Sequence, residues 1–344
     1  MNRRAFVTLL LALAVSLSIV TSVAGQQQFP LDTTKGLSAG KGLKIVVTEY
    51  LGRKAVRPIV SAPDGQPASD LVMVDGTNFQ DGIIEVDVAA KGVPPFPGAR
   101  APGFIGIAFR VQPNDTRYEY FYIRPGNSRS GDQAMRNHAT QYAAFPGFGW
   151  PVSRRQWPWL YESHADLEPG AWTKMRIEVA GRSAKLYVNG STQPCLVVEG
   201  MRNEDLRGGV GLYVGPGTEA YFSNLRITPS PTKQVMTGTD AAGSWTLKIA
   251  TDMGPQEAEF TFKRDGAKID GIYSGTLGRE LPVTGTWRSG FIELKLRGTW
   301  TDPRGQGKDE VEAVLAGWLQ GNSGSGHIVV AGKTQGTWTA DKSQ

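Results

Sequence analysis

The chain of 344 residues holds a single cysteine, Cys195, and only three histidines, His138, His164 and His327. One cysteine excludes an internal disulfide framework and any zinc or iron–sulfur site built from several cysteines. So few histidines argue against a multi-histidine metal centre. Because Cys195 opens the apolar stretch 195–198, we expect a buried thiol rather than an intermolecular bridge.

Sustained helical periodicity is also missing. The 43 glycines and 21 prolines follow no Gly-X-Y repeat, which excludes collagen. Instead, short runs alternate apolar and polar residues between Gly, Pro, Asn and Asp, the pattern of strands. The clearest runs are 82–88, 104–111, 118–123, 173–179, 184–188, 210–214 and 221–227. Asn189-Gly190 predicts a hairpin turn, and the sequence as a whole predicts an all-β protein.

Basic residues form no cluster, so the net charge of +5 does not indicate a nucleic-acid partner. Arg3 and Arg4 precede an apolar run that ends in small residues at 22–25, which predicts a signal peptide over residues 1–25. A retained membrane anchor is the alternative. Cleavage after Ala24 or Gly25 would lower the charge to 5 − 2 = +3. No second apolar stretch of about 20 residues follows, so we expect a secreted or periplasmic protein without a membrane span.

The composition divides the rest of the chain in two. Residues 230–242 read as a linker between a β-sandwich domain over residues 26–229 and a small antiparallel β-barrel or meander over residues 243–344. Four Gly-x-Trp signals mark the second part. We expect their indoles to close the barrel ends rather than to bind a ligand; they are Trp245, Trp287, Trp300 and Trp338.

One strand face in the first part carries more aromatic and charged groups than solubility requires. Alternation places Tyr118, Tyr120 and Tyr122 on one side of their strand, and we expect Arg110 and Arg124 beside them. Tyrosine rings stack on the C–H faces of sugars, and arginines bind hydroxyls. The alternative is that the tyrosines are simply good strand formers.

Small residues and a long polar loop accompany this face. Gly106 and Ala108 would leave a gap for a ligand, and Glu85 and Asp87 would join the face if residues 82–88 are a neighbouring strand. We expect the loop to close over the tyrosines with six polar residues: Asn127, Arg129, Arg136, Asn137, His138 and Gln141. Alternatively, the loop is a cover that satisfies its own polar groups.

The segments 79–88, 103–110, 169–179, 186–190, 211–215 and 220–227 resemble the concanavalin A-like lectin/glucanase superfamily. Within it, residues 26–229 look most like laminin-G-like domains of secreted bacterial proteins and the related 3-keto-disaccharide hydrolase domains. The resemblance implies a jelly-roll sandwich. The C-terminal part is similar to small lipocalin- or avidin-like barrels. Lectins, adhesion modules, glycosidases and lyases share the sandwich fold, so the resemblance specifies the fold more than the activity.

The resemblance also offers a test for catalysis. Laminarinase-like enzymes of this fold carry Glu-x-Asp-x-x-Glu, whereas this chain has Glu85, Asp87 and then Ala90 in the third position. The pair Glu85 and Asp87 lacks an acid on the opposite side of a scissile bond, as a retaining mechanism needs. A different mechanism would use Glu119, Glu162 or His164. No cofactor is predicted, although some laminin-G-like domains bind calcium at the sandwich rim.

These observations favour an exported lectin-like protein that binds a glycan or another polyhydroxylated ligand on the tyrosine-bearing face. The first alternative is a carbohydrate-active enzyme, a glycoside hydrolase or 3-keto-disaccharide hydrolase-like protein, using Glu85, Asp87 or Glu162. The second is an envelope adhesion module that docks another protein through the loop at residues 129–142.

Overall fold

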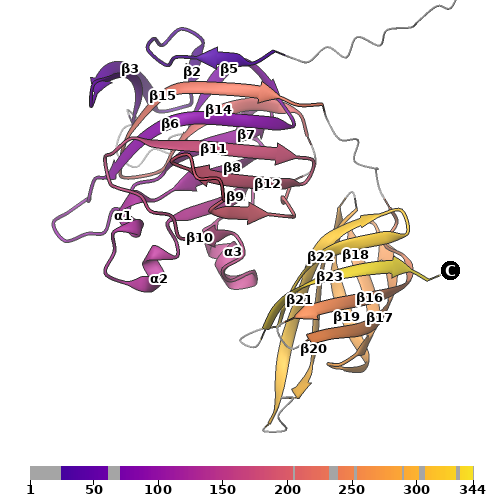
Figure 1. Cartoon of the computed structure of the whole chain (residues 1–344). Coiled ribbons are helices and arrows are strands. Elements are labelled where there is room, and N and C mark those ends of the chain that lie inside the picture. Colours follow the sequence, from indigo (N-terminus) through magenta and orange to yellow (C-terminus); the bar gives the residue numbers. More distant parts are fainter. Residues whose placement is uncertain are drawn as a thin grey trace, which may run out of the picture.

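The computed structural model describes residues 25–60, 70–203, 206–231, 239–251, 254–288, 290–301, 307–330 and 334–343. It contains a two-sheet β-sandwich followed by a closed antiparallel barrel (Figure 1), which confirms the predicted fold class. The predicted signal peptide lies outside the described residues except for Gly25 and stays a prediction. In the described part of the chain, no helix is both long and apolar enough to span a membrane.

The sandwich consists of an eight-stranded first sheet and a seven-stranded second sheet. The first sheet runs in the order β13 (Leu196–Val198), β12 (Ser183–Val188), β11 (Thr173–Ala180), β6 (Gly82–Gly92), β15 (Thr218–Pro229), β4 (Arg53–Val60) and β3 (Leu43–Tyr50), with β1 (Gln27–Phe29) also paired to β15. The second runs β10 (Glu162–Ser163), β9 (Thr140–Phe145), β8 (Tyr118–Ile123), β7 (Ile105–Val111), β14 (Gly208–Val214), β5 (Leu71–Phe79) and β2 (Leu37–Ala39). Short helical segments lie in the connections: η1 (Pro113–Asp115), α1 (Pro125–Ser128), α2 (Gln133–Arg136) and α3 (Trp150–Gln156).

Alternating apolar residues hold the two sheets together. Ile84 and Val86 of β6 face Phe109 and Phe121 of the second sheet within one buried core. The seven predicted strands all form, with ends that differ by a few residues. The predicted hairpin turn forms as well, because Asn189 and Gly190 both adopt the positive φ angles, 51° and 74°, that such a turn needs.

The assignment of strands to sheets differs from one expectation. The strand carrying Glu85 and Asp87 belongs to the first sheet, whereas the tyrosine-bearing strand β8 belongs to the second. Both strands turn their apolar residues inward, so their polar residues point out on opposite sides of the sandwich. The two carboxylates therefore do not join the tyrosines.

Arg110 also lies elsewhere than predicted. Its φ of 56° is in the left-handed region, beside a register shift between β7 and β14, so strict alternation ends there. The guanidinium reaches the first sheet, where Nη2 donates to Asp81 Oδ1 at 2.9 Å and to the Gly181 carbonyl at 2.7 Å. Both side chains of this ion pair are 2% exposed. Arg110 thus links the two sheets and is not available to a ligand on the tyrosine side.

The barrel closes through eight strands: β16 (Gly243–Thr251), β17 (Gly254–Asp265), β18 (Lys268–Gly275), β19 (Gly278–Arg288), β20 (Phe291–Thr301), β21 (Lys308–Gln320), β22 (Ser323–Val330) and β23 (Thr334–Lys342). Trp245 and Trp338 are buried in its core, and Trp287 and Trp300 pack partly buried against it. The indole nitrogens of Trp245 and Trp338 donate to backbone carbonyls. This confirms the structural role predicted for these tryptophans.

The barrel and the sandwich share an apolar contact. Strand β21 buries Ala313 and Leu315 inside the barrel, whereas Val314 and Trp318 point outward and belong to the sandwich core cluster. Arg202 of the sandwich forms an ion pair with Glu293 of β20 at the same junction. The sandwich core therefore continues onto the outer surface of the barrel.

The Arg110–Asp81 pair yields a stability prediction. Replacing Arg110 by Met leaves the buried Asp81 carboxylate without its cation, so we expect Arg110→Met to lower the free energy of unfolding by ~3–5 kcal/mol. The matched control is Arg129→Met, whose ion pairs to Asp166 and Glu168 are solvent-exposed and should contribute less than ~1 kcal/mol. Urea denaturation measures both. Equal losses of unfolding free energy in the two variants would show that the buried ion pair of Arg110 does not stabilise the sandwich.

Candidate functional site

The outer side of the second sheet carries a packed layer of aromatic rings, called here the tyrosine face: Tyr118, Tyr120 and Tyr122 of β8 and Tyr213 of β14. The Tyr213 ring centroid lies 4.9 Å from that of Tyr120 and 5.3 Å from that of Tyr122. Phe145 of β9 stacks on Tyr118 at 5.2 Å. The predicted clustering of the three β8 tyrosines is therefore present, and Tyr213 extends it.

Small residues on β7 allow these rings to meet. Gly106 lies in register between Tyr122 and Tyr213, on the strand that separates β8 from β14. A Cβ atom at Gly106 would lie 2.0 Å from the Phe121 carbonyl oxygen, so this position tolerates no side chain. The small-residue gap predicted to admit a ligand is occupied instead by contact between Tyr213 and Tyr122.

Three tyrosine hydroxyls on this face remain available. Tyr122 accepts a hydrogen bond from Arg124 Nη2 at 2.8 Å. The hydroxyls of Tyr118, Tyr120 and Tyr213 bond to no residue in the described ranges. Burial raises the pKa of all four tyrosines, and the charge of Asp70 adds to this rise in the pKa of Tyr118. The free hydroxyls are thus neutral and can both donate and accept hydrogen bonds.

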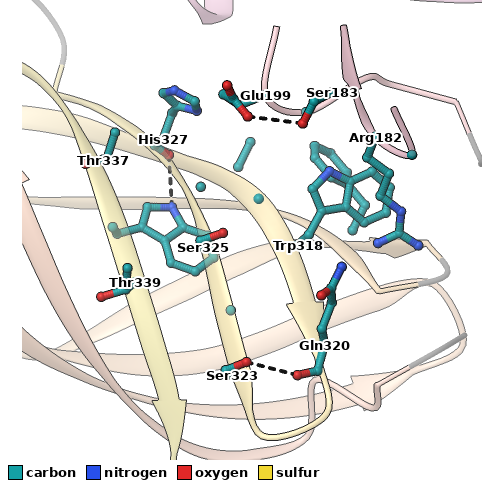
Figure 2. A pocket seen from close by; sticks show the side chains of 18 of the residues that line it. Arg182, Ser183, Glu199, Trp318, Gln320, Ser323, Ser325, His327, Thr337 and Thr339 are labelled. Atoms are coloured by element: carbon teal, nitrogen blue, oxygen red, sulfur yellow. Dashed lines mark hydrogen bonds between the residues drawn. The ribbon is translucent and has the colours of Figure 1, made fainter. Parts of the chain in front are cut away.

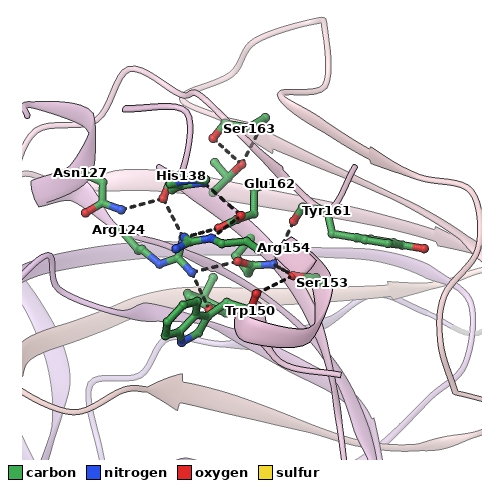
Figure 3. A network of polar contacts seen from close by, with 12 residues as sticks. Arg124, Asn127, His138, Trp150, Ser153, Arg154, Tyr161, Glu162 and Ser163 are labelled. Carbon is green, nitrogen blue, oxygen red and sulfur yellow. Dashed lines mark hydrogen bonds and ion pairs between the residues drawn. The ribbon is translucent and has the colours of Figure 1, made fainter. Parts of the chain in front are cut away.

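A buried ion cluster, called here the Glu162 cluster, closes one end of the tyrosine face (Figure 3). Arg154 of α3 donates to both oxygens of Glu162, at 2.7 and 2.6 Å. Arg124 Nη1 donates to Glu162 Oε1 at 3.0 Å, and His138 Nδ1 lies 3.0 Å from Oε2. Burial alone would raise the pKa of Glu162, but the hydrogen bonds from Arg154 and the charge of Arg124 hold that pKa below its usual range. Burial lowers the pKa of His138, so its imidazole is neutral at pH 7.

The polar groups of this cluster bond to one another rather than facing outward. The Arg124 guanidinium also donates to the His138 carbonyl, to Tyr122 and to Gln141 Oε1. Asn127 Nδ2 donates to the same His138 carbonyl. Of the residues predicted to contact a ligand, Arg124, Asn127, His138 and Gln141 therefore do lie together, but they form a buried support behind the face. This matches the alternative in which the loop satisfies its own polar groups.

The remaining loop residues lie elsewhere. Arg129 forms ion pairs with Asp166 and Glu168, and Arg136 and Asn137 bond to Gln133. Arg129 and Arg136 line a separate shallow cavity of about 270 Å³ that contains no tyrosine. In the structure, the segment from Arg129 to Asn137 does not close over the tyrosine face.

Exposed aromatic side chains instead pack against the cluster and against Tyr118. Trp150 is 47% exposed, Trp159 53% and Phe145 43%. Arg154 lies over the Trp150 ring, and Trp159 stacks on His138 with an interplanar angle of 2°. These three rings, called here the aromatic rim, are fixed through the Glu162 cluster and through Tyr118.

Sequence reasoning missed Tyr213 and Asp70. Tyr213 lies in a predicted strand, but only the pairing of β14 with β7 shows that it joins the tyrosine face. Asp70 directly precedes β5, and its carbonyl accepts a hydrogen bond from the Val214 amide. Burial raises the pKa of Asp70. The alternation of apolar and polar residues around Tyr213 could have indicated its outward direction. No local sequence pattern indicated a role for Asp70.

The predicted catalytic carboxylates are engaged in other contacts. Asp87 forms ion pairs with Arg53 and Lys174 on the first sheet, in the same outer row as Glu85. Glu119 is fully buried in the core and bonds to Tyr142 and Asn203, and burial raises its pKa. Within the described ranges, no group of three or more His, Cys, Asp or Glu side chains could hold a metal ion. Cys195 is a free, partly buried thiol whose pKa burial raises to about 11.

The Glu162 cluster predicts a specific acid response. Because the folded-state pKa of Glu162 lies below its ordinary value of 4.5, its stabilisation is fully present above that value and is lost as the pH falls through the folded-state pKa. We expect Glu162→Gln to destabilise the protein by ~3–5 kcal/mol at pH 7, because the buried Arg124 and the half-buried Arg154 lose their counter-charge. The difference from the wild type should shrink steadily below pH 4.5 in urea titrations. A difference that is independent of pH would show that the ion pairs do not stabilise the fold.

A model of the 3-keto-alpha-glucoside-1,2-lyase-like domain family matches residues 46–228, more than half of the chain. No curated protein matches. Among solved structures, a carbohydrate binding module from Bacillus subtilis is 14% identical, covers 55% of this chain and 98% of its own, and has a TM-score of 0.33. The GlcNAcα1-4Gal-releasing endo-β-galactosidase from Clostridium perfringens is 8% identical, covers 92% of this chain and 96% of its own, and has a TM-score of 0.35.

The family assignment rests on the family model and confirms the predicted relation to 3-keto-disaccharide hydrolase domains. It indicates a carbohydrate-related function. The chain belongs to the 3-keto-alpha-glucoside-1,2-lyase-like domain family.

Proposed function

We propose that the sandwich binds a glycan along the tyrosine face and the aromatic rim. The observation that carries this proposal is the set of unpaired hydroxyls on Tyr118, Tyr120 and Tyr213. The exposed rings of Trp150 and Trp159 pack on the Glu162 cluster, which contacts this face through Tyr122. Aromatic rings receive the apolar faces of sugars, and the neutral hydroxyls would exchange hydrogen bonds with sugar hydroxyls.

The charged groups nearby support binding rather than hydrolysis. Glu162 is ionised and surrounded by Arg124, Arg154 and His138, so it is a poor proton donor. The other predicted pair, Glu85 and Asp87, lies on the opposite side of the sandwich. A glycosidase needs two carboxyl groups on either side of one bond, and none of the carboxylates predicted for this role supplies such a pair at the tyrosine face.

A glycan array tests the proposal with two matched tyrosines. Tyr120 is half-buried on the tyrosine face, and Tyr50 is half-buried on the outer side of the first sheet. We expect Tyr120→Ala to weaken binding about tenfold because it removes a stacking ring and a hydroxyl. Tyr50→Ala should bind as the wild type does.

Two results would contradict the proposal. Equal losses of glycan binding in Tyr120→Ala and Tyr50→Ala would show that the glycan does not bind on the tyrosine face. Absence of glycan binding by a folded wild-type chain would favour the protein-docking alternative, to be followed by partner capture through the segment 129–142.

A second candidate function is a lyase activity that uses Asp70. A 1,2-lyase acting on a 3-keto glucoside needs a base that takes the proton from C2 while the bond from C1 to the leaving oxygen breaks. Asp70 is a carboxylate close enough to Tyr118 for its charge to affect that hydroxyl, and burial raises the pKa of Asp70. A raised pKa brings a carboxylate closer to the range in which general bases work.

The test for this candidate compares two aspartates near β5. We expect Asp70→Asn to slow elimination from methyl 3-keto-α-glucoside by about 100-fold or more, the usual contribution of a general base. Asp75→Asn changes an exposed aspartate of β5 that bonds to Ser38 and should leave the rate unchanged. NMR detection of released methanol measures both. No turnover by the wild type, or equal rates in the two variants, would refute this candidate.

A further inference from the structure

A large cavity lies between the sandwich and the barrel (Figure 2). It has a volume of about 570 Å³. Strands β21, β22 and β23 form one wall, and the turn between β11 and β12 forms the other together with Glu199 and Gly200. We call it the interdomain cleft. Tyr161, next to Glu162, also lines the cleft, but no residue of the tyrosine face does, and neither do Glu162, Arg124, Arg154 and His138.

The barrel wall follows from the alternation of its strands. Residues pointing outward from β21, β22 and β23 form rows across the three strands: Ala316, His327 and Thr337 in one row, and Trp318, Ser325 and Thr339 in the next. Val314 and Val329 continue this surface and pack against the sandwich core. Because the β22 and β23 positions of the two rows are polar, this half of the barrel surface does not join that core and instead lines the cleft.

The sandwich wall is held in place by two contacts. The Arg182 guanidinium carbon lies 3.3 Å from the centroid of the Trp318 ring. Ser183 Oγ donates to Glu199 Oε2 at 3.1 Å. The wall therefore presents a positioned carboxylate and hydroxyl toward the outward residues of the barrel (Figure 2).

A buried donor in the cleft lacks a partner. Trp318 is 8% exposed, and its indole Nε1 has no hydrogen-bond partner. Gly200, beside Glu199, lies close to it on the sandwich wall, and a Cβ atom there would lie 3.6 Å from that nitrogen. Figure 2 shows the nitrogen on the side of the ring that faces Ser183 and Glu199. A buried N–H without an acceptor is costly, so an acceptor supplied by a ligand would remove this cost.

The chemistry of the walls identifies the class of ligand. Ser325, Thr337 and Thr339 supply exposed hydroxyls, and Glu199 supplies the carboxylate. Burial lowers the pKa of His327, which keeps its imidazole neutral at pH 7. The cation of Arg182 lies against Trp318, while Glu199 would repel an anion. Neutral donors and acceptors around one carboxylate suit a polyhydroxylated molecule without charge.

We propose that the interdomain cleft is a second saccharide site, which binds a neutral mono- or disaccharide between the barrel and the sandwich. Its volume lies within the range of pockets that hold small molecules, about 300–1,000 Å³. Trp318 Nε1 donates to a sugar hydroxyl, Glu199 accepts from another, and the serine and threonine hydroxyls contact the ring substituents. The site stands on its own residues and does not depend on binding at the tyrosine face.

The test uses the full chain with glucose, galactose, maltose, cellobiose and trehalose as probes. Hydrogen–deuterium exchange locates each bound sugar, and calorimetry gives its affinity. We expect protection of residues 180–183 and 323–327. Thr339→Trp fills the cleft and should abolish this binding, whereas Thr261→Trp, on the outward side of β17 away from the cleft, should not change it. Glu199→Gln should weaken binding about tenfold, as loss of a hydrogen bond to a charged group does.

The results separate this site from the proposed function. Tyr120→Ala should leave the protection of residues 323–327 unchanged, and Thr339→Trp should leave glycan binding at the tyrosine face unchanged. If Thr339→Trp does not fold, the affinity of Glu199→Gln and the hydrogen–deuterium exchange of the wild type decide whether the cleft binds a sugar. Absence of cleft protection with every probe, or equal affinities for Glu199→Gln and the wild type, would overturn the second site whatever happens at the tyrosine face.

Discussion

Burial of a single carboxylate, Glu162, organises one end of the sandwich. An unpaired carboxylate cannot remain ionised in such a place, so Arg124, Arg154 and His138 converge on it from three different segments. Two of these partners in turn hold other parts of the structure in place. Arg154 holds α3 and the Trp150 ring, while His138 provides the surface on which Trp159 stacks. The exposed rings of Trp150 and Trp159 therefore owe their positions to a buried ion cluster.

The tyrosine face obeys a second constraint, the spacing of strands in a sheet. Rings on β8 and β14 are separated by β7, and they meet only because Gly106 carries no side chain. Tyr122 and Tyr213 pack against each other and fill the space above the small residues of β7. This packing leaves the hydroxyls and the half-buried ring of Tyr120 accessible, so the binding proposed for this face would use ring edges and hydroxyls more than a deep groove.

Local patterns in the sequence were sufficient to predict the strands, the Asn189-Gly190 turn and the buried tryptophans of the barrel, because each depends on neighbouring residues alone. Three features depend on distant parts of the chain and were therefore missed. Nothing local shows that Glu85 and Tyr120 lie in different sheets. The positive φ of Arg110, which redirects its side chain, arises at a register shift with β14. The burial of Arg124 requires Glu162, which lies far along the chain.

The same alternation that builds the barrel also determines where the two parts touch and where they stay apart. An ordinary barrel strand needs one apolar face, but β21 has two, and its outward Val314 and Trp318 extend the sandwich core. On β22 the outward residues change from Val329 to His327 and Ser325 within a few positions. Apolar contact stops where hydroxyl and imidazole groups begin, since burying them without partners would be costly. The cleft therefore opens at this change of chemistry, and Trp318 stands at its border, with its ring in the apolar contact and its nitrogen facing the polar side.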